Sequence, residues 1–238
     1  MQGKRRKKPG LPAVCAVIVA AGSSRRMGGE NKLLLPLGEI PVLARTLRAF
    51  QKCAAVRDIV LVCREQDIMP YTELAQSFGI DKLRTVTRGG ETRTESVLAG
   101  VTAAPEDAAL VAVHDGARPL VSEAVITEAI TAAAEFDAAA PVVPVKDSIK
   151  RIENGNIAAD VPRDTLAAVQ TPQVFRKSLL CHALTSAAER GYSFTDDCAA
   201  VESLGTVVKA THGSYENIKI TTPEDILIAE AFLNREGR

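Results

Sequence analysis

Short apolar runs, separated by longer segments with a helical pattern, are the feature that most restricts how this chain can fold. Several of the runs are continuously apolar and rich in Val and Ile. Such runs are typical of strands buried on both faces, as in a parallel sheet covered by helices. The alternation therefore predicts a doubly wound, three-layer α/β/α protein. The predicted strands are residues 13–20, 58–63, 82–87, 109–115, 138–145 and 206–211.

The segments between the predicted strands carry signals for helix starts and stops. Thr92 is followed three residues later by Glu95, which resembles a capping box. Gly205 is a stop signal for the helix that precedes it. The other start signals are Pro41 in a first turn, and Ser122, Thr195 and Thr222 as N-caps.

Residues 146–170 break the alternation of strands and helices. They contain the pair Asn154-Gly155 between polar, weakly apolar flanks. Asn-Gly is a strong signal for a β-hairpin turn, so we predict a β-arm that protrudes from the domain. An isolated hairpin is only marginally stable in water, and we therefore expect this arm to pack on a partner subunit.

The length of 238 residues suits one large α/β domain. We assign residues 13–238 to that domain and residues 1–12 to a basic tail, which is predicted to be disordered. The tail and the apolar run after it imitate a secretory signal peptide, but cleavage there would delete the first strand. The five scattered cysteines form no C-x-x-C pair and predict reduced thiols in a cytoplasmic protein.

The charge balance and the aromatic content limit the partners. The formal net charge is zero, whereas a general nucleic-acid binder carries a basic excess. Trp is absent and aromatic residues make up 4% of the chain, so a stacking surface for single strands is not expected. No apolar stretch approaches the roughly 20 residues that cross a bilayer. The three histidines lie far apart, and no protein-held metal site is predicted.

Glycines and charged residues follow several of the predicted strands. In open α/β sheets, ligands bind at the carboxyl ends of the strands. Each residue alone is explained by a solvated face, a turn or a cap. Together, cations from separate parts of a neutral chain predict a ligand with several phosphates. The residues are Gly22, Arg25, Arg26, Lys32, Gly89, Gly90, Asp115, Arg118, Lys146, Ser148 and Lys219.

The turn after the first strand, Ala20-Ala21-Gly22, has only small side chains. Small residues let backbone N–H groups approach a phosphate or a base closely. The turn matches neither the Walker A pattern nor G-x-G-x-x-G, because Gly22 is followed by Ser23 and Ser24. The sequence therefore does not favour a P-loop ATPase or a dinucleotide-dependent oxidoreductase.

A series of motifs in this order resembles the 2-C-methyl-D-erythritol 4-phosphate cytidylyltransferase family. The motifs are AAGSSRRMG with Lys32, GGETRTESVLAG, VHDGARP, PVKDSIKR, QTPQVF, TDD and NIKITTPED, and the resemblance extends from about residue 13 to about residue 235. It implies a Rossmann-like nucleotidyltransferase fold with a mostly parallel sheet. It also implies the transfer of a cytidylyl group from CTP to methylerythritol phosphate, with release of pyrophosphate.

The resemblance also implies roles for particular residues. Arg26 and Lys32 neutralise the triphosphate and the transition state, while Arg163 and Lys219 position the attacking phosphate. The cytidine part of CTP is held by Ala20, Ala21, Gly22, Gly90, Glu91 and Ser96. The sugar phosphate is held by Asp115, Arg118, Ser148, Arg163, Thr171, Thr195 and Lys219.

The family pattern further implies a homodimer and a magnesium cofactor. The 146–170 arm crosses to the neighbouring subunit, so Ser148 and Arg163 serve the partner's site. Mg²⁺ is bound mainly through the phosphates of CTP. The chain departs from the usual pattern where Ser24 replaces a Gly, Glu91 an Asp and Ser148 a Thr.

The expected chemistry is direct in-line displacement, because a phosphate monoester is already an anionic nucleophile near neutral pH. Whether Asp115 contacts sugar hydroxyls or the metal is left open by the sequence. Two alternatives also stay open: a ribitol-5-phosphate cytidylyltransferase with the same chemistry, and a non-catalytic nucleotide-sensing protein on the same scaffold.

Overall fold

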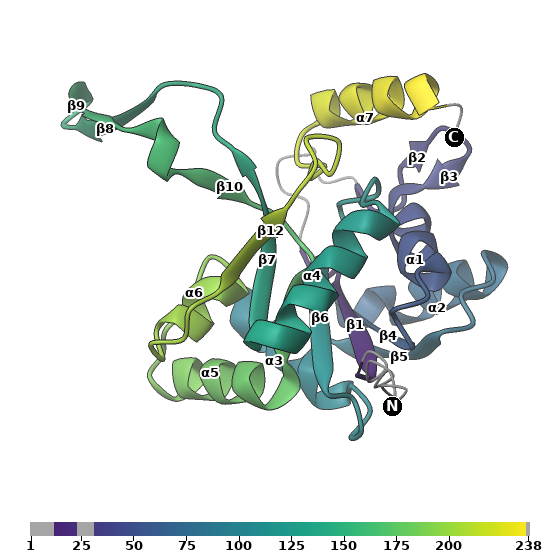
Figure 1. The fold of residues 1–238 in the computed structure, drawn as a ribbon. Coiled ribbons are helices and arrows are strands. Elements are labelled where there is room, and N and C mark those ends of the chain that lie inside the picture. Colours follow the sequence, from purple (N-terminus) through teal and green to yellow (C-terminus); the bar gives the residue numbers. More distant parts are fainter. Residues whose placement is uncertain (1–11, 23–30, 237–238) are drawn as a thin grey trace, which may run out of the picture.

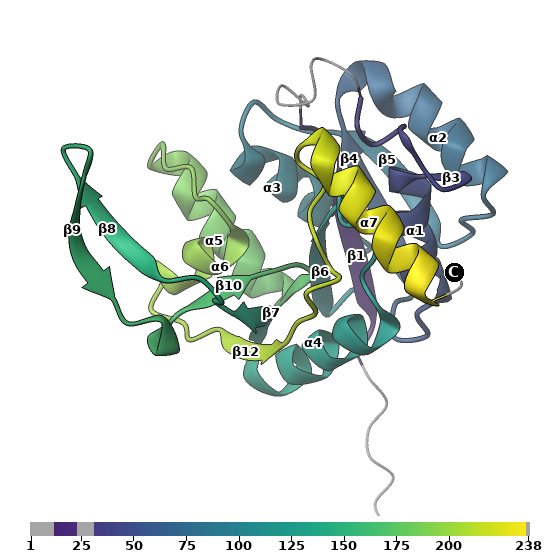
Figure 2. The ribbon, with the colours of Figure 1, turned by 90° about the horizontal axis from the view of Figure 1, so that it is seen from above.

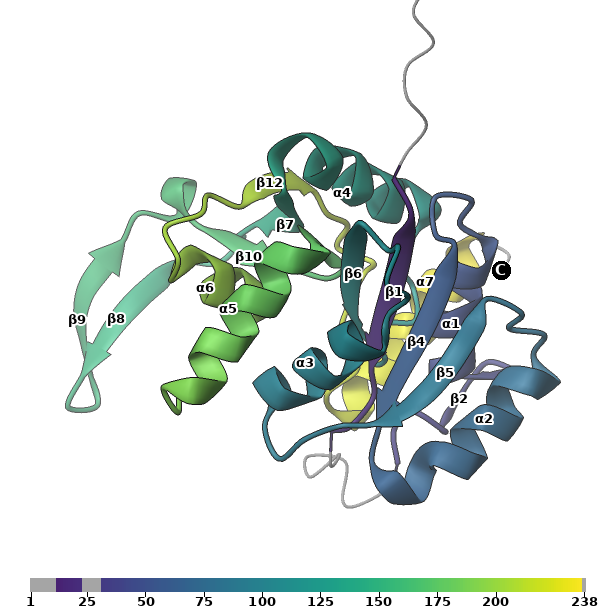
Figure 3. The same cartoon turned by 90° about the horizontal axis from the view of Figure 1, so that it is seen from below.

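The predicted apolar strands form the middle of a twisted sheet in a computed structural model, which describes residues 12–22 and 31–236. Within that part of the chain the sheet has eight strands in the order β10-β7-β11-β6-β1-β4-β5, with β12 also paired to β7. The four strands β6, β1, β4 and β5 are parallel and lie side by side in Figure 3. The sheet strands are β1 (Val14–Val19), β4 (Asp58–Cys63), β5 (Leu83–Arg88), β6 (Leu110–Asp115), β7 (Ala138–Pro144), β10 (Ala167–Val169), β11 (Gln173–Arg176) and β12 (Lys209–His212).

Helices cover both faces of this sheet, as Figures 1 and 2 show. One apolar cluster joins the sheet to α1, α2, α4 and α7, and a second joins its other face to α3, α5 and α6. This is the three-layer arrangement that the alternation predicts. The helices are α1 (Val42–Lys52), α2 (Ile68–Ser77), α3 (Arg93–Ala103), α4 (Glu123–Phe136), α5 (Lys177–Glu189), α6 (Asp197–Glu202) and α7 (Pro223–Glu236).

Each of the six predicted strands is present, with small shifts at its ends. The largest shift is in the last one, where β12 begins at Lys209 rather than at residue 206. Two strands of this sheet, β10 and β11, were not predicted. Both run antiparallel to β7, and β11 lies between β6 and β7. These strands are short, and their pairing depends on neighbours that are distant in sequence, so local pattern gives little signal for them.

The helix caps agree with the sequence at two positions and differ at two. Thr92 and Glu95 form the predicted capping box, and the Ser122 side chain accepts a hydrogen bond from Val125 N. The N-cap of α6 is Asp196 rather than Thr195, and its carboxylate accepts from Ala199 N at 2.9 Å. A carboxylate also complements the positive end of the helix. Pro41 is the N-cap of α1 and precedes its first turn.

The segment between β7 and β11 contains the predicted hairpin, β8 (Ile149–Glu153) and β9 (Asn156–Val161). Asn154 and Gly155 both have positive φ, as the favoured hairpin turns require. Figures 1 and 2 show the hairpin extending away from the sheet. The predicted arm of 146–170 is too long at its end, because β10 (Ala167–Val169) pairs with β7 in the main sheet.

The strands β2 (Pro36–Leu37) and β3 (Ile40–Pro41) form a separate short ladder ahead of α1. Residues 1–11 of the predicted tail lie outside the described residues. Among the helices that are described, none has both the length and the apolar character needed to cross a bilayer.

Candidate active site

A cavity of about 570 Å³ opens where β1 and β6 end, at the edge of the sheet that the sequence singles out. Nine of the residues predicted to bind CTP or sugar phosphate line it. They are Ala20, Ala21, Gly22, Lys32, Gly90, Glu91, Ser96, Asp115 and Lys219. Residues that are up to about 200 positions apart in the chain therefore line one cavity, as the distribution of cations predicts.

A larger cavity, of about 860 Å³, lies between α1, α7 and the loop that follows β6. It is lined by helix side chains such as Arg45, Arg48 and Glu230, and it contains none of the predicted site residues. Because ligands of open α/β sheets bind at the carboxyl ends of the strands, we take the smaller cavity as the candidate active site.

One side of this cavity is built from backbone and small side chains. Gly89 and Gly90 pass so close to α3 that an added Cβ on Gly90 would lie 2.3 Å from Glu95 Cβ. The Ser96 hydroxyl accepts from Gly90 N at 3.1 Å, and Glu95 Oε2 accepts from Glu91 N at 2.7 Å. The loop is thus folded tightly over the N-terminus of α3, whose positive end faces the cavity.

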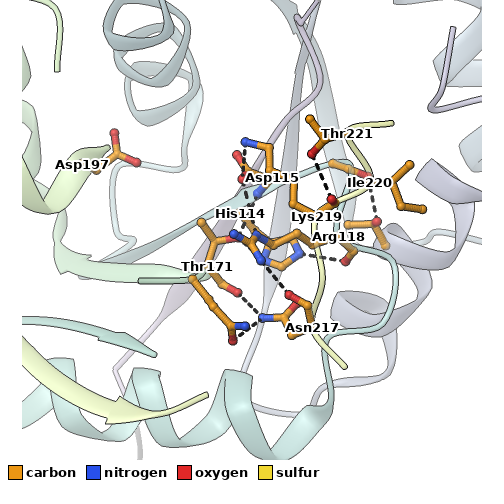
Figure 4. Close-up of polar contacts among 12 residues, drawn as sticks. His114, Asp115, Arg118, Thr171, Asp197, Asn217, Lys219, Ile220 and Thr221 are labelled. Carbon is orange, nitrogen blue, oxygen red and sulfur yellow. Dashed lines mark hydrogen bonds and ion pairs between the residues drawn. The ribbon is translucent and has the colours of Figure 1, made fainter. Parts of the chain in front are cut away.

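The opposite side carries the charges. Lys219 Nζ lies 2.8 Å from the Asp115 carboxylate at the end of β6, and Arg118 Nε lies 3.5 Å from it. Burial raises the pKa of the Asp115 carboxyl, but the neighbouring cations, chiefly Lys219, outweigh burial and lower the pKa to about 2. Asp115 is therefore ionised at neutral pH and holds Lys219 at the cavity wall, as Figure 4 shows.

Lys32 connects the two ends of the chain at the cavity. Its Nζ donates a hydrogen bond of 2.7 Å to the backbone oxygen of Ile220, the residue after Lys219. Both lysines thereby approach the same wall from separate segments. Arg26, the other predicted catalytic cation of this loop, lies outside the described residues.

A buried ion pair at the cavity edge was missed by the sequence analysis. Arg93, which lines the cavity, donates two hydrogen bonds of 2.8 and 2.7 Å to the carboxylate of Asp197. Burial raises the pKa of the Asp197 carboxyl, and the Arg93 guanidinium opposes that rise. Both residues stand in quoted motifs, GGETRTES and TDD, but their pairing across about 100 positions has no signal in one sequence.

Five predicted sugar-phosphate residues that the structure describes do not line the cavity with the others. Thr171 is buried beneath Asp115, and its hydroxyl accepts from Asp115 N at 3.2 Å. Ser148 and Arg163 lie at the base of the hairpin, where Arg163 Nη1 donates to Lys146 O at 2.8 Å. Thr195 is exposed just ahead of the α6 cap.

Arg118, the fifth predicted residue that is absent from the lining, also points into the protein. Its Nη1 donates to the backbone oxygen of Asn217 at 2.6 Å, and its side chain is 12% exposed. Asn217 itself is fully buried, two residues before Lys219. Figure 4 shows Arg118, Thr171 and Asn217 converging below Asp115.

This arrangement suits a polyanionic ligand and a reaction that needs no strong base. The described lining contains neither histidine nor cysteine, and it includes three cations, Lys32, Arg93 and Lys219. Fixed cations and dipoles of this kind stabilise charge that develops on phosphate oxygens. No group of three or more potential metal ligands of the His, Cys, Asp or Glu type is present among the described residues.

Comparison with known proteins agrees with this geometry. The sequence model of the 2-C-methyl-D-erythritol 4-phosphate cytidylyltransferase family matches residues 14–235. A curated protein of that name from Desulforamulus reducens is 46% identical over 227 residues, which cover 94% of this chain and 97% of the relative. One from Bacillus thuringiensis is 44% identical over 219 residues, which cover 92% and 96%.

Solved structures are similar over nearly the whole chain. A crystal structure of 4-diphosphocytidyl-2C-methyl-D-erythritol synthase from Anaerococcus prevotii superposes with a TM-score of 0.84 at 32% identity, covering 94% of this chain and 97% of that one. The 2-C-methyl-D-erythritol 4-phosphate cytidylyltransferase from Thermus thermophilus gives 0.76 at 31% identity, with coverage of 93% and 99%. The chain described here belongs to the 2-C-methyl-D-erythritol 4-phosphate cytidylyltransferase family.

Proposed function

We propose that this chain transfers a cytidylyl group from CTP to 2-C-methyl-D-erythritol 4-phosphate. The products are 4-diphosphocytidyl-2-C-methyl-D-erythritol and pyrophosphate, in the non-mevalonate route to isoprenoids. Membership of the family supports the reaction. The observation that carries it in this chain is the meeting of Lys32, Lys219 and the 89–96 loop around one cavity.

The residues of the cavity fit the demands of this reaction. A phosphate oxygen of the sugar phosphate attacks the α-phosphorus of CTP in line, and pyrophosphate leaves. The nucleophile is already anionic, so the main obstacle is repulsion between two polyanions. We propose that Lys32 and Arg26 stabilise the negative charge that develops on the triphosphate, because fixed cations lower the barrier.

We assign the wall formed by residues 20–22 and 90–96, here called the glycine-loop wall, to the cytidine part of CTP. The residues are those that the resemblance names: Ala20, Ala21, Gly22, Gly90, Glu91 and Ser96. The close packing of Gly90 against α3 and the small side chains after β1 let an incoming base or phosphate approach the backbone closely. This wall therefore recognises its ligand mainly by shape and by hydrogen bonds.

We assign the charged wall to the sugar phosphate. Lys219 is held by Asp115 before the substrate arrives, which supports a role in positioning the attacking phosphate. Prior positioning of this kind supplies several kcal/mol of a barrier. Arg118 and Thr195 stay assigned to the same substrate by resemblance alone, whereas Thr171 is buried beneath Asp115.

Magnesium is the proposed cofactor. The described lining has two carboxylates, Asp115 and Glu91, and Asp115 is already paired with Lys219. That donor set fits an ion that is held mainly by CTP phosphates and water, which is how Mg²⁺ commonly binds nucleotides. When bound, the ion supplies further charge neutralisation at the phosphates.

We further propose that the protein is a cytoplasmic homodimer joined through the hairpin. The hairpin carries exposed apolar side chains, with Ile152 58% and Ile157 70% exposed, which supports a partner on that surface. Ser148 and Arg163 at its base would then serve the partner's cavity. The five free cysteines, four of them buried, support a reducing compartment.

A pyrophosphate-release assay tests the proposed function. Protein and Mg²⁺ are mixed with each of the four nucleoside triphosphates, and with either methylerythritol phosphate or ribitol 5-phosphate as acceptor. We expect release with CTP and methylerythritol phosphate and only background without an acceptor. Faster release with ribitol 5-phosphate would favour the related cytidylyltransferase, and release in no combination would favour a nucleotide-sensing protein.

A further inference from the structure

A closed ring of hydrogen bonds lies beneath the charged wall of the cavity (Figure 4). Asp115 N donates to Thr171 Oγ1 at 3.2 Å, and Thr171 O accepts from Asn217 Nδ2 at 2.9 Å. Asn217 O accepts from Arg118 Nη1 at 2.6 Å, and Arg118 N donates back to Asp115 O at 3.0 Å. The ring joins three chain segments, and Lys219 follows Asn217 by two residues.

His114 lies beside this ring and determines the direction of the hydrogen bond that the Thr171 hydroxyl makes with it. Its Nε2 lies 3.2 Å from Arg118 O, and a carbonyl oxygen can only accept, so Nε2 carries the proton. His114 is fully buried, and burial lowers its pKa to about 4, so the imidazole is neutral near pH 7. Nδ1 is then an acceptor, and the Thr171 hydroxyl donates to it at 2.9 Å.

The Thr171 hydroxyl is therefore engaged inside the protein. It gives its single proton to His114 and accepts the N–H of Asp115. Thr171 is 4% exposed and does not line the cavity. The same residue holds Asn217 through its backbone oxygen, so it touches both segments that supply the Asp115–Lys219 pair.

We propose that Thr171 is a positioning residue, which acts through Asp115 and Lys219 rather than by touching the sugar phosphate. Its hydroxyl links the buried His114 imidazole to the backbone of Asp115, and its carbonyl links Asn217 to the same ring. The ring sets where the Asp115–Lys219 pair meets the substrate. This inference rests on the proposed cytidylyl transfer for its activity readout.

The test compares Thr171→Val, which keeps the shape and removes the hydroxyl, with Thr171→Ser, which keeps the hydroxyl. We expect Val to lower kcat/KM for the sugar phosphate by about 10-fold to 100-fold, because small misplacements of catalytic groups have effects of that size. Ser should restore most of the loss. In an Asp115→Asn background, Thr171→Val should lower kcat/KM by a further factor of less than about three, because the effects of residues that act as a unit are not additive. An equal loss in both backgrounds would mean that Thr171 contacts the substrate itself, and would overturn the proposal.

A second readout does not depend on the reaction. In the free protein, Thr171→Val should speed hydrogen exchange at the Asp115 amide by at least about tenfold, while Thr171→Ser should not. The amide of Val60 in β4 serves as the reference for global unfolding. Unchanged exchange at Asp115 in the Val variant contradicts the proposal, even if the enzyme has another substrate. Lack of turnover in the parent protein, with the exchange result as expected, rejects only the proposed function.

His114 gives a matched pair of variants for the case in which Thr171→Val does not fold. Asn can place an amide oxygen near the position of Nδ1 and so still accept from Thr171, whereas Gln can place an amide nitrogen near Nε2 and donate only to Arg118 O. We expect His114→Asn to retain at least about fivefold more activity, and a slower Asp115 exchange, than His114→Gln. The reverse order would contradict the role of the Thr171 hydroxyl.

Discussion

The two walls of the cavity solve the problem of binding an anion by different means. The wall formed by residues 20–22 and 89–96 uses small side chains, a closely packed glycine loop and a capped helix end. The wall formed after β6 and before α7 uses ionised side chains that already neutralise one another, as in the Asp115–Lys219 pair. The first wall should therefore respond mainly to changes of shape, and the second to changes of charge and protonation.

The largest expected effect is the loss of a cation. Lys32→Ala should lower kcat by about 10²–10³ with the fold retained, since removing one preorganised charge has that effect on developing negative charge. We expect the same of Arg26→Ala. The measurement is steady-state pyrophosphate release, with circular dichroism as a check on folding. Lys52→Ala, an exposed lysine that does not line this cavity, is the matched control. Normal turnover of the Lys32 variant would contradict the role of Lys32 at the triphosphate.

The free energy of unfolding should also depend on pH, through the buried His114 beneath the charged wall. The unfolded chain protonates this imidazole below about 6.5, but burial keeps the folded form neutral until about 4. Stability is therefore full above pH 6.5 and falls as the pH drops from there to 4, by roughly 3 kcal/mol for this group. Urea unfolding across that range should give a shallower fall for His114→Gln than for the parent. If the free energy of unfolding fell equally with pH in both proteins, the pKa of His114 would not be lowered by folding.

CTP binding at the glycine-loop wall should be sensitive to one added methyl group. In Gly90→Ala the new Cβ meets the Cβ of Glu95, so the loop has to move. We expect the affinity for CTP, measured by calorimetry without acceptor, to fall about tenfold, because overpacking typically costs 1–3 kcal/mol. Gly22→Ala is the contrast, since no atom of the described residues lies within 4 Å of its added Cβ and the unfolding temperature should not change. An unaltered loop in a crystal structure of Gly90→Ala would count against the shape argument.

The smallest expected effect concerns the cap of α3. Thr92→Ala removes a side chain that accepts from Glu95 N at 3.1 Å, and it should lower the free energy of unfolding by about 1 kcal/mol. The effect on CTP affinity should be smaller than that of Gly90→Ala, because the loop backbone still has its bond to Ser96. Ser122→Ala, which removes the cap of α4 instead, controls for a general loss of stability. A larger loss of CTP affinity in Thr92→Ala than in Gly90→Ala would reverse the order that we expect.

The sequence predicted the parts of this molecule that depend on local pattern. The strand ends that carry Gly22, Gly90 and Asp115 meet at one cavity because carboxyl ends of parallel strands share an edge, and Lys219 reaches the same cavity from the segment before α7. The capping box at Thr92 and the turn at Asn154-Gly155 also follow from nearby residues alone.

The parts that were missed depend on contacts between distant segments. The Arg93–Asp197 pair and the Asn217 side chain have buried partners that only tertiary packing brings close. The same reason explains β11, whose pairing partners β6 and β7 surround it. At α6 the sequence offered Thr195, Asp196 and Asp197 in succession, and the choice of Asp196 as cap goes with the burial of Asp197 against Arg93.

The late position of Lys219 in the chain has a consequence for synthesis on the ribosome. Asp115 and the parallel strands around it are made first, while the lysine that balances this carboxylate arrives about a hundred residues later. A nascent chain can thus build most of its sheet while the binding wall for the sugar phosphate does not yet exist. That wall is completed only when the segment before α7 emerges and brings Lys219 to Asp115.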